Sequence, residues 1–181
     1  MKSEYKLRKA TLEERPAIEE LIAASARGLS RADYSEQQIE AALATVFGVD
    51  TDLIIDGTYF VADTGEKLVG CGGWSKRKNL FGGDRFATRD SGQLDPNSEP
   101  AKIRAFFVHP DFARQGIART ILEACESEAR AAGFRALELM STLPGIPLYR
   151  ALGYKGDERI EYEFGGVIIP LVPMRKQIGP D

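Results

Sequence analysis

The chain of 181 residues contains one histidine, His109, and only two cysteines, Cys71 and Cys125, which lie far apart in the sequence. Such a set cannot supply a usual zinc site. No Ser-x-Gly elbow accompanies His109, which argues against a hydrolase with a Ser-His-Asp triad. No Walker sequence is present. Both cysteines sit in apolar segments, so we expect them to be buried and inert, and we expect no metal.

The chain also lacks a basic excess and a long apolar run. It has 24 lysines and arginines against 27 acidic residues, a formal charge of -3 and a pI near 5.4. This balance argues against a general nucleic-acid binder. No apolar run approaches the roughly 18 residues that span a bilayer, and residues 1–10 are charged and have no apolar core region, so we do not expect them to act as a leader. We therefore expect no nucleic acid or membrane as partner. With unpaired cysteines, the location is expected to be cytoplasmic.

The most informative stretch is 107–134, FVHPDFARQGIARTILEACESEARAAGF. An apolar strand ends at His109, a tight turn follows, and an amphipathic helix runs to a left-handed stop at Gly133, on which Phe134 packs back. We predict one buried helix face, with Glu126 and the other charged residues outside it. Its members are Ile117, Ile121, Leu122, Cys125, Ala129 and Ala132.

The start of this helix is predicted to bind an anion. The first backbone N–H groups of a helix lack internal partners and point outward, where the macrodipole adds positive charge. Arg114 and Arg119 flank this start, where the dipole disfavours cations. An anion bound between them would remove the conflict, and two solvated arginines are the alternative.

In the first third, a strand over Tyr5–Ala10 is followed by a capping box at Thr11 and Glu14. The first helix has an inward face of Ile18, Leu21, Ile22 and Ser25, and we expect Gly28 to end it. A second capping box, Ser35 with Gln38, begins the second helix. Arg31 and Tyr34 lie in the connection between the helices. A surface loop is the common reason for such residues, and lining an acceptor site is the alternative.

The middle of the chain predicts an antiparallel hairpin and then a long loop. Tyr59–Asp63 and Leu68–Ser75 read as strands joined at Gly65. No helix follows the glycines at 70, 72 and 73, so they indicate a bulge or a close backbone approach rather than a dinucleotide loop. Residues 76–101 form a long polar loop, either a lid or a disordered segment.

The last elements give a βαβ unit and a hairpin. Lys102–Val108 is predicted as a strand with Ile103, Ala105 and Phe107 on one face and Arg104 and Phe106 on the other. Ala136–Ser141 should lie parallel to it. A short helix near Ile146–Leu152 and strands near Arg159–Phe164 and Val167–Met174 complete the chain. The fold class is α/β (α+β), with one domain over residues 1–181.

These residues resemble the GNAT superfamily of acyl-CoA-dependent N-acyltransferases. Residues 113–118, ARQGIA, match its signature Q/R-x-x-G-x-G/A except at Ala113. VHPDF precedes this match, LYRALGY follows it, and the resemblance runs from about Tyr59 to the C-terminus. It implies a single-domain fold with a mixed sheet of six to seven strands and about four helices. It also implies acetyl-CoA as cosubstrate. It leaves open whether the chain forms a homodimer.

The resemblance implies a cofactor site in three parts. Backbone atoms of the strand before the loop would pair with the pantetheine arm, the loop and helix start would hold the pyrophosphate, and Thr142 stands where the family commonly has asparagine. The implied residues are Phe106, Phe107, Val108, Arg114, Gln115, Gly116, Ile117, Ala118, Arg119 and Thr142.

Tyr149 in LYRALGY matches the family tyrosine that acts as general acid beside the sulfur. The alternative is a packed tyrosine whose hydroxyl is satisfied elsewhere. Glu138 is the candidate base, acting through water, or else it forms an ion pair with Lys102 or Arg104. These two cations could also suit an acceptor with an acidic group.

The leading hypothesis is an N-acetyltransferase that transfers an acetyl group directly, in a ternary complex, to a primary amine of a small molecule or peptide. The alternative is a non-catalytic, regulatory acyl-CoA-binding module, which the departures at Ala113 and Thr142 keep open.

Overall fold

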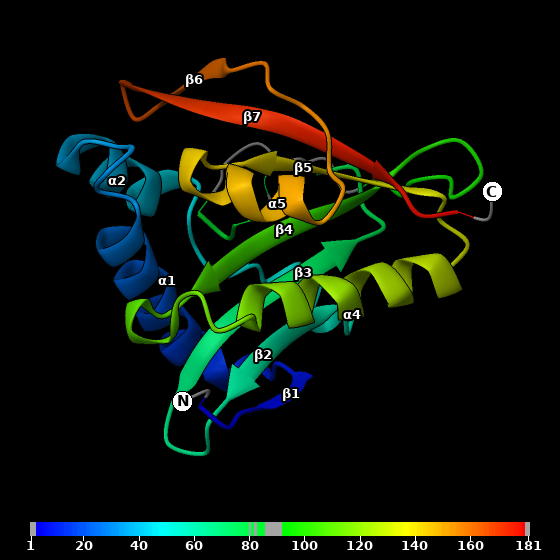
Figure 1. Cartoon of the computed structure of the whole chain (residues 1–181), viewed down its shortest axis with the longest axis horizontal. Coiled ribbons are helices and arrows are strands. Elements are labelled where there is room, and N and C mark those ends of the chain that lie inside the picture. The colour runs from blue at the N-terminus through cyan, green and yellow to red at the C-terminus, as the bar shows by residue number, and fades with distance from the viewer. Residues whose placement is uncertain (1–2, 80, 82, 86–91, 180–181) are drawn as a thin grey trace.

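The computed structural model describes residues 3–79, 81, 83–85 and 92–179. Within them a mixed sheet of seven strands lies between two layers of helices (Figure 1). The strands are β1 Lys6–Lys9, β2 Tyr59–Asp63, β3 Leu68–Ser75, β4 Ala101–Val108, β5 Ala136–Ser141, β6 Ile160–Phe164 and β7 Val167–Gln177. The α-helices are α1 Arg15–Leu29, α2 Glu36–Thr45, α3 Thr51–Ile55, α4 Ile117–Ala131 and α5 Ile146–Ala151.

The strand order is β1-β2-β3-β4-β5-β7-β6, and β4 with β5 is the one parallel pair among these strands. One core cluster joins α4 and α5 to the sheet, and the other two clusters join α1, α2 and α3 to it. The predicted α/β class, the hairpin of β2 with β3 and the parallel pair around α4 are confirmed.

The parallel pair separates soon after it forms. Only Ala101 with Leu137 and Lys102 with Glu138 are in register, although both strands continue for several residues. Beyond these two pairs, each strand turns a backbone edge toward the other with no strand between them. The centre of the sheet therefore contains a gap that opens toward the start of α4.

The predicted faces of β4 are wrong because the strand bulges. Ala105 has a left-handed φ of 59° and the register with β3 shifts beside it. A bulge adds one residue to a strand and reverses the side-chain alternation beyond it. Ile103 therefore packs with Phe106 in the core under α4, while Ala105 and Phe107 pack on the side of α1.

Gly28 does not end the first helix, because α1 continues through Leu29. The glycine instead permits a close approach: a Cβ there would lie 2.3 Å from Cγ of Pro110, in the turn after β4. The absent side chain lets α1 pack directly on this turn. The glycines of β3 act similarly, since a Cβ at Gly72 would lie 2.7 Å from the Phe106 ring.

Two predictions for α4 are wrong at single positions. Ala132 follows the last helical residue and is exposed, whereas the other predicted apolar residues are buried. Glu126 is buried, and its carboxylate accepts hydrogen bonds from the Tyr154 hydroxyl at 3.1 Å and Lys176 Nζ at 3.0 Å. The spacing of helix residues cannot reveal these partners, which come from elsewhere in the chain. Gly133 ends the helix with a φ of 92° and Phe134 is buried, both as predicted.

Tyr34, predicted as part of a surface loop, is buried and tied to two distant segments. Its hydroxyl donates to the Pro170 carbonyl at 2.6 Å and accepts from the Leu143 N–H at 3.0 Å. Arg31 is exposed as expected. The short helix α3, capped by Asp50, has no counterpart in the sequence prediction, because five residues show too little periodicity.

The described flanks of the long loop over residues 76–101 contact the body of the protein. Arg77 pairs with Asp56, the Phe81 ring lies 5.3 Å from the Tyr162 ring, and Leu94 is buried. Residues 80, 82 and 86–91 of this loop lie outside the described residues, so the choice between a lid and a disordered segment is not addressed for them.

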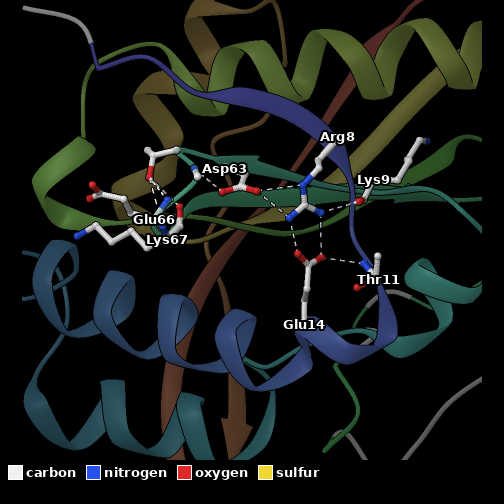
Figure 2. A network of polar contacts seen from close by, with 9 residues as sticks. Arg8, Lys9, Thr11, Glu14, Asp63, Glu66 and Lys67 are labelled. Atoms are coloured by element: carbon white, nitrogen blue, oxygen red, sulfur yellow. Dashed lines mark hydrogen bonds and ion pairs between the residues drawn. The ribbon is translucent and has the colours of Figure 1, made fainter.

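The N-terminal strand is joined to the sheet and to the start of the helical layer by a charged network (Figure 2). The Arg8 guanidinium donates to Asp63 at 2.9 Å and 3.1 Å, and it also pairs with Glu14. The Gly65 N–H, then the Arg8 guanidinium, hold the pKa of Asp63 below its usual range. Arg8 does the same for Glu14. These lowered pKa values link the network to acid stability.

We expect Arg8→Met to lower the free energy of unfolding at pH 7 by about 1 kcal/mol. Because both carboxyls have lowered pKa values in the folded state, their contribution is complete above about pH 4 to 5 and is lost as pH falls through the folded values. Denaturant unfolding at pH 7 and pH 3 should show the difference from wild type shrinking in acid. Arg27→Met breaks the exposed pair with Glu40 and should show almost no difference from wild type at either pH.

Candidate active site

A cavity of about 750 Å³ occupies the gap between β4 and β5. Its walls are the edge of β4, the start of α4, the last turns of α1, the end of β5 and the first turns of α5. It reaches past the bulge at Ala105 to the residues that follow α2. The cavity is therefore a passage through the centre of the sheet, with the α4 N-terminus at one mouth.

The mouth at α4 has the features of an anion site. Arg114 and Gly116 have left-handed φ values of 60° and 86°, and α4 begins at Ile117. Successive N–H groups in such turns and at helix starts converge on an anion. Arg114 and Arg119 line the mouth, and Arg119 also pairs with Glu123 at 3.0 Å. A Cβ added to Gly116 would meet nothing within 4 Å, so space in front of the loop is open.

Most of the sequence-predicted site residues line this one cavity. They are Phe106, Phe107, Val108, Arg114, Gly116, Ile117, Ala118, Arg119, Thr142 and Tyr149. Gln115 and Glu138 do not line it. The Gln115 side chain turns instead toward the N-terminal segment, where its Oε1 accepts a hydrogen bond from the Ser3 N–H at 3.1 Å.

Tyr149 lies on α5 and lines the cavity. The residue is 8% exposed, and its ring lies 6.5 Å from the Phe106 ring and 5.8 Å from the Tyr154 ring. Among the residues that the structure describes, none forms a hydrogen bond with its hydroxyl. The alternative, a packed tyrosine whose hydroxyl is satisfied by another protein group, therefore finds no such group among the described residues. Burial raises the pKa of the phenol above its ordinary value near 10, so it stays protonated at neutral pH.

Glu138 lies away from this tyrosine. It forms an ion pair with Lys102 and lines a separate, smaller hollow of about 240 Å³ together with Lys155 and Arg175. Of the two roles predicted for Glu138, the ion pair is the one that the structure shows. The sheet register explains this result, because Lys102 and Glu138 are paired before the strands separate.

The inner end of the cavity is charged. Arg104 Nε lies 3.6 Å from Asp50 Oδ2, and both side chains are buried. Arg104 is the one of the two predicted β4 cations that lines the cavity, since Lys102 faces Glu138. The sequence offered no signal for the partner, because Asp50 precedes a helix that was not predicted.

The residues of the α1 wall were not among the sequence-predicted site residues. Ser25, Leu29 and Ser30 line the cavity opposite the β4 edge. Ser25 was predicted to face inward with Ile18, Leu21 and Ile22, and a serine on an otherwise apolar helix face was the available signal.

The described part of the chain shows no group of three or more His, Cys, Asp or Glu side chains arranged to hold a metal ion. No helix in that part is long and apolar enough to cross a membrane.

The protein is thus an α/β protein whose one parallel pair of described strands separates beside a helix N-terminus, with a buried tyrosine lining the gap. The family model of the acetyltransferase (GNAT) family matches residues 19–154. The chain belongs to this family. No curated protein sequence matches the chain.

Solved structures share the fold over almost the whole chain. A GCN5-related N-acetyltransferase from Rhodopseudomonas palustris has a TM-score of 0.72 at 21% identity and covers 98% of both chains. PaiA N-acetyltransferase from Thermoplasma acidophilum, in complex with coenzyme A, has a TM-score of 0.64 at 15% identity, over 96% of this chain and 99% of that one. A GNAT family acetyltransferase from Brucella melitensis, in complex with acetyl-CoA, has a TM-score of 0.59 at 17% identity, over 99% and 91%.

Proposed function

We propose that the chain is a cytoplasmic N-acetyltransferase that uses acetyl-CoA and a primary amine of a small molecule or peptide, bound together. The observation that carries this proposal is the Tyr149 hydroxyl. It lies in the cavity between the separated strands, stays protonated, and has no hydrogen-bond partner among the described residues. A donor on the cavity wall that makes no hydrogen bond with the described residues is available to a bound ligand.

The residues present fit acetyl-CoA. The mouth offers the helix N-terminus with Arg114 and Arg119, which suit a pyrophosphate. The exposed edge of β4 offers backbone groups to an arm that lies along it like an added strand. The loop around Gly116 holds its shape by backbone geometry, so Ala113 in place of a polar side chain weakens this site without removing it.

When bound, acetyl-CoA supplies a thioester carbonyl for an amine to attack and a sulfur that leaves as thiolate. Tyr149 would give its hydroxyl proton to that sulfur, while Phe106 and Tyr154 keep its ring in place. The charged pair of Arg104 and Asp50 forms the inner wall on the acceptor side. We assign the removal of the amine proton to water rather than to Glu138.

We expect Glu138→Gln to keep turnover within a fewfold of wild type, because the carboxylate lines a different hollow and pairs with Lys102. Release of free thiol from acetyl-CoA with a confirmed acceptor measures this. A fall of a hundredfold with unchanged stability would restore Glu138 as the base.

A non-catalytic acyl-CoA-binding module is the second candidate, and the absence of Glu138 from the cavity lining favours it. A screen of primary amines with acetyl-CoA, read by thiol release, separates the two. Thiol release that depends on an amine supports the enzyme. Binding of CoA without release for any amine would support the module.

A further inference from the structure

The edge of β4 that faces the gap carries a backbone donor at Val108. On the opposite edge, the His109 N–H donates to the Val69 carbonyl of β3 at 2.9 Å. Successive residues of a strand point their N–H groups to opposite edges. The Val108 N–H therefore points into the gap between β4 and β5, where no strand accepts it.

Ser25 of α1 accepts a hydrogen bond from that donor. The Val108 N–H donates to Ser25 Oγ at 3.2 Å, and both residues line the cavity. The contact joins two segments 83 residues apart. It depends on the close packing of α1 on the turn after β4, which Gly28 allows.

The hydroxyl of Ser25 has a proton left to donate. A serine hydroxyl donates one hydrogen bond and accepts up to two. Accepting from Val108 does not use the proton, and no acceptor for it occurs among the described residues. Ser25 is only 5% exposed, so solvent does not easily replace the missing acceptor. Buried polar groups are normally paired, which indicates that the cavity's occupant brings a carbonyl to this point.

We propose that Ser25 binds the pantetheine arm of CoA, with its hydroxyl accepting from the Val108 N–H and donating to an amide carbonyl of the arm. This inference rests on the proposed function. It adds a contact from α1 to a cofactor site that the sequence had located on β4, the loop, α4 and Thr142. The arm is then held between two elements, and α1 helps to set how far it enters the cavity.

The experiment compares two probes in direct binding by calorimetry: CoA, and 3′,5′-ADP, which keeps the adenosine, the 3′-phosphate and one 5′-phosphate but lacks the arm. We expect Ser25→Ala to weaken CoA about tenfold, as one lost hydrogen bond predicts. Its affinity for 3′,5′-ADP should change by less than about twofold. Ser25→Thr, which keeps the hydroxyl, should retain most of the CoA affinity and serves as a second test if Ser25→Ala folds poorly.

Ser75→Ala is the matched control. Ser75 is also buried, and its Oγ accepts a backbone N–H, from Arg77 at 3.0 Å, but it does not line the cavity. It should bind both probes like wild type. Equal or tighter CoA binding by Ser25→Ala would overturn the inference and leave the proposed function intact, because Ser25 would then only cap Val108. If the wild-type protein binds neither probe, both the inference and the proposed function are overturned.

Discussion

Tyr149→Phe is expected to lower turnover by about a hundredfold or more while CoA affinity changes little. The substitution keeps the ring, and therefore the contacts with Phe106 and Tyr154. It removes only the hydroxyl, which makes no hydrogen bond with the described residues. Loss of an unpaired hydroxyl should hardly change the free energy of unfolding. Because burial raises the pKa of this phenol, wild-type turnover should also show no alkaline loss from Tyr149 below about pH 10.

Steady-state kinetics with a confirmed acceptor and calorimetry with CoA make this measurement. Tyr154→Phe is the informative contrast, because it removes a neighbouring hydroxyl that is bonded to Glu126 at 3.1 Å. That variant should lose about 1 kcal/mol of stability yet keep turnover within a fewfold. Near-normal turnover of Tyr149→Phe would mean that water or another group is the acid, and the family role would not apply at this position.

What the sequence predicted well depends on neighbours along the chain. The capping boxes at Thr11 and Ser35, the boundaries of β2 and β3 and the stop at Gly133 all rest on residues within a few positions of each other. The prediction of an anion site also rests on local residues, since a helix start carries its unpaired N–H groups wherever it is placed, and it stays a prediction. Such features can be predicted from sequence because they depend on neighbouring residues and not on tertiary contacts.

The failures depend on partners that are distant in sequence. Tyr34 bonds to residues 109 and 136 positions away, and Glu126 to one 50 positions away. Neither pattern of burial is visible in local spacing. The bulge at Ala105 places a non-glycine residue in the left-handed region, which no local signal announces. Ser25 belongs to this class too, because its partner becomes available only where β4 and β5 separate.

Gly116→Val is expected to abolish the stabilisation that CoA gives to the wild-type protein. CoA at about a hundredfold over its Kd should add about 2.7 kcal/mol to the free energy of unfolding and raise Tm. Gly116 has a φ of 86°, a conformation that a β-branched residue rarely adopts. A valine there would either move the backbone that directs the first N–H groups of α4 or place its methyl groups in the open space where the phosphates would lie. Either response removes the anion site.

The control must separate loss of the site from strain alone. Gly166 in the β6–β7 hairpin has a similar φ of 79°, and a Cβ there also meets nothing within 4 Å. Gly166→Val should therefore lower Tm by a comparable amount without CoA, yet keep the full upward shift with CoA. Thermal unfolding of both variants with and without CoA decides the matter. If Gly116→Val folds and CoA raises its Tm as much as that of wild type, the phosphates do not bind at the α4 N-terminus, because a change at Gly116 would then not affect their binding.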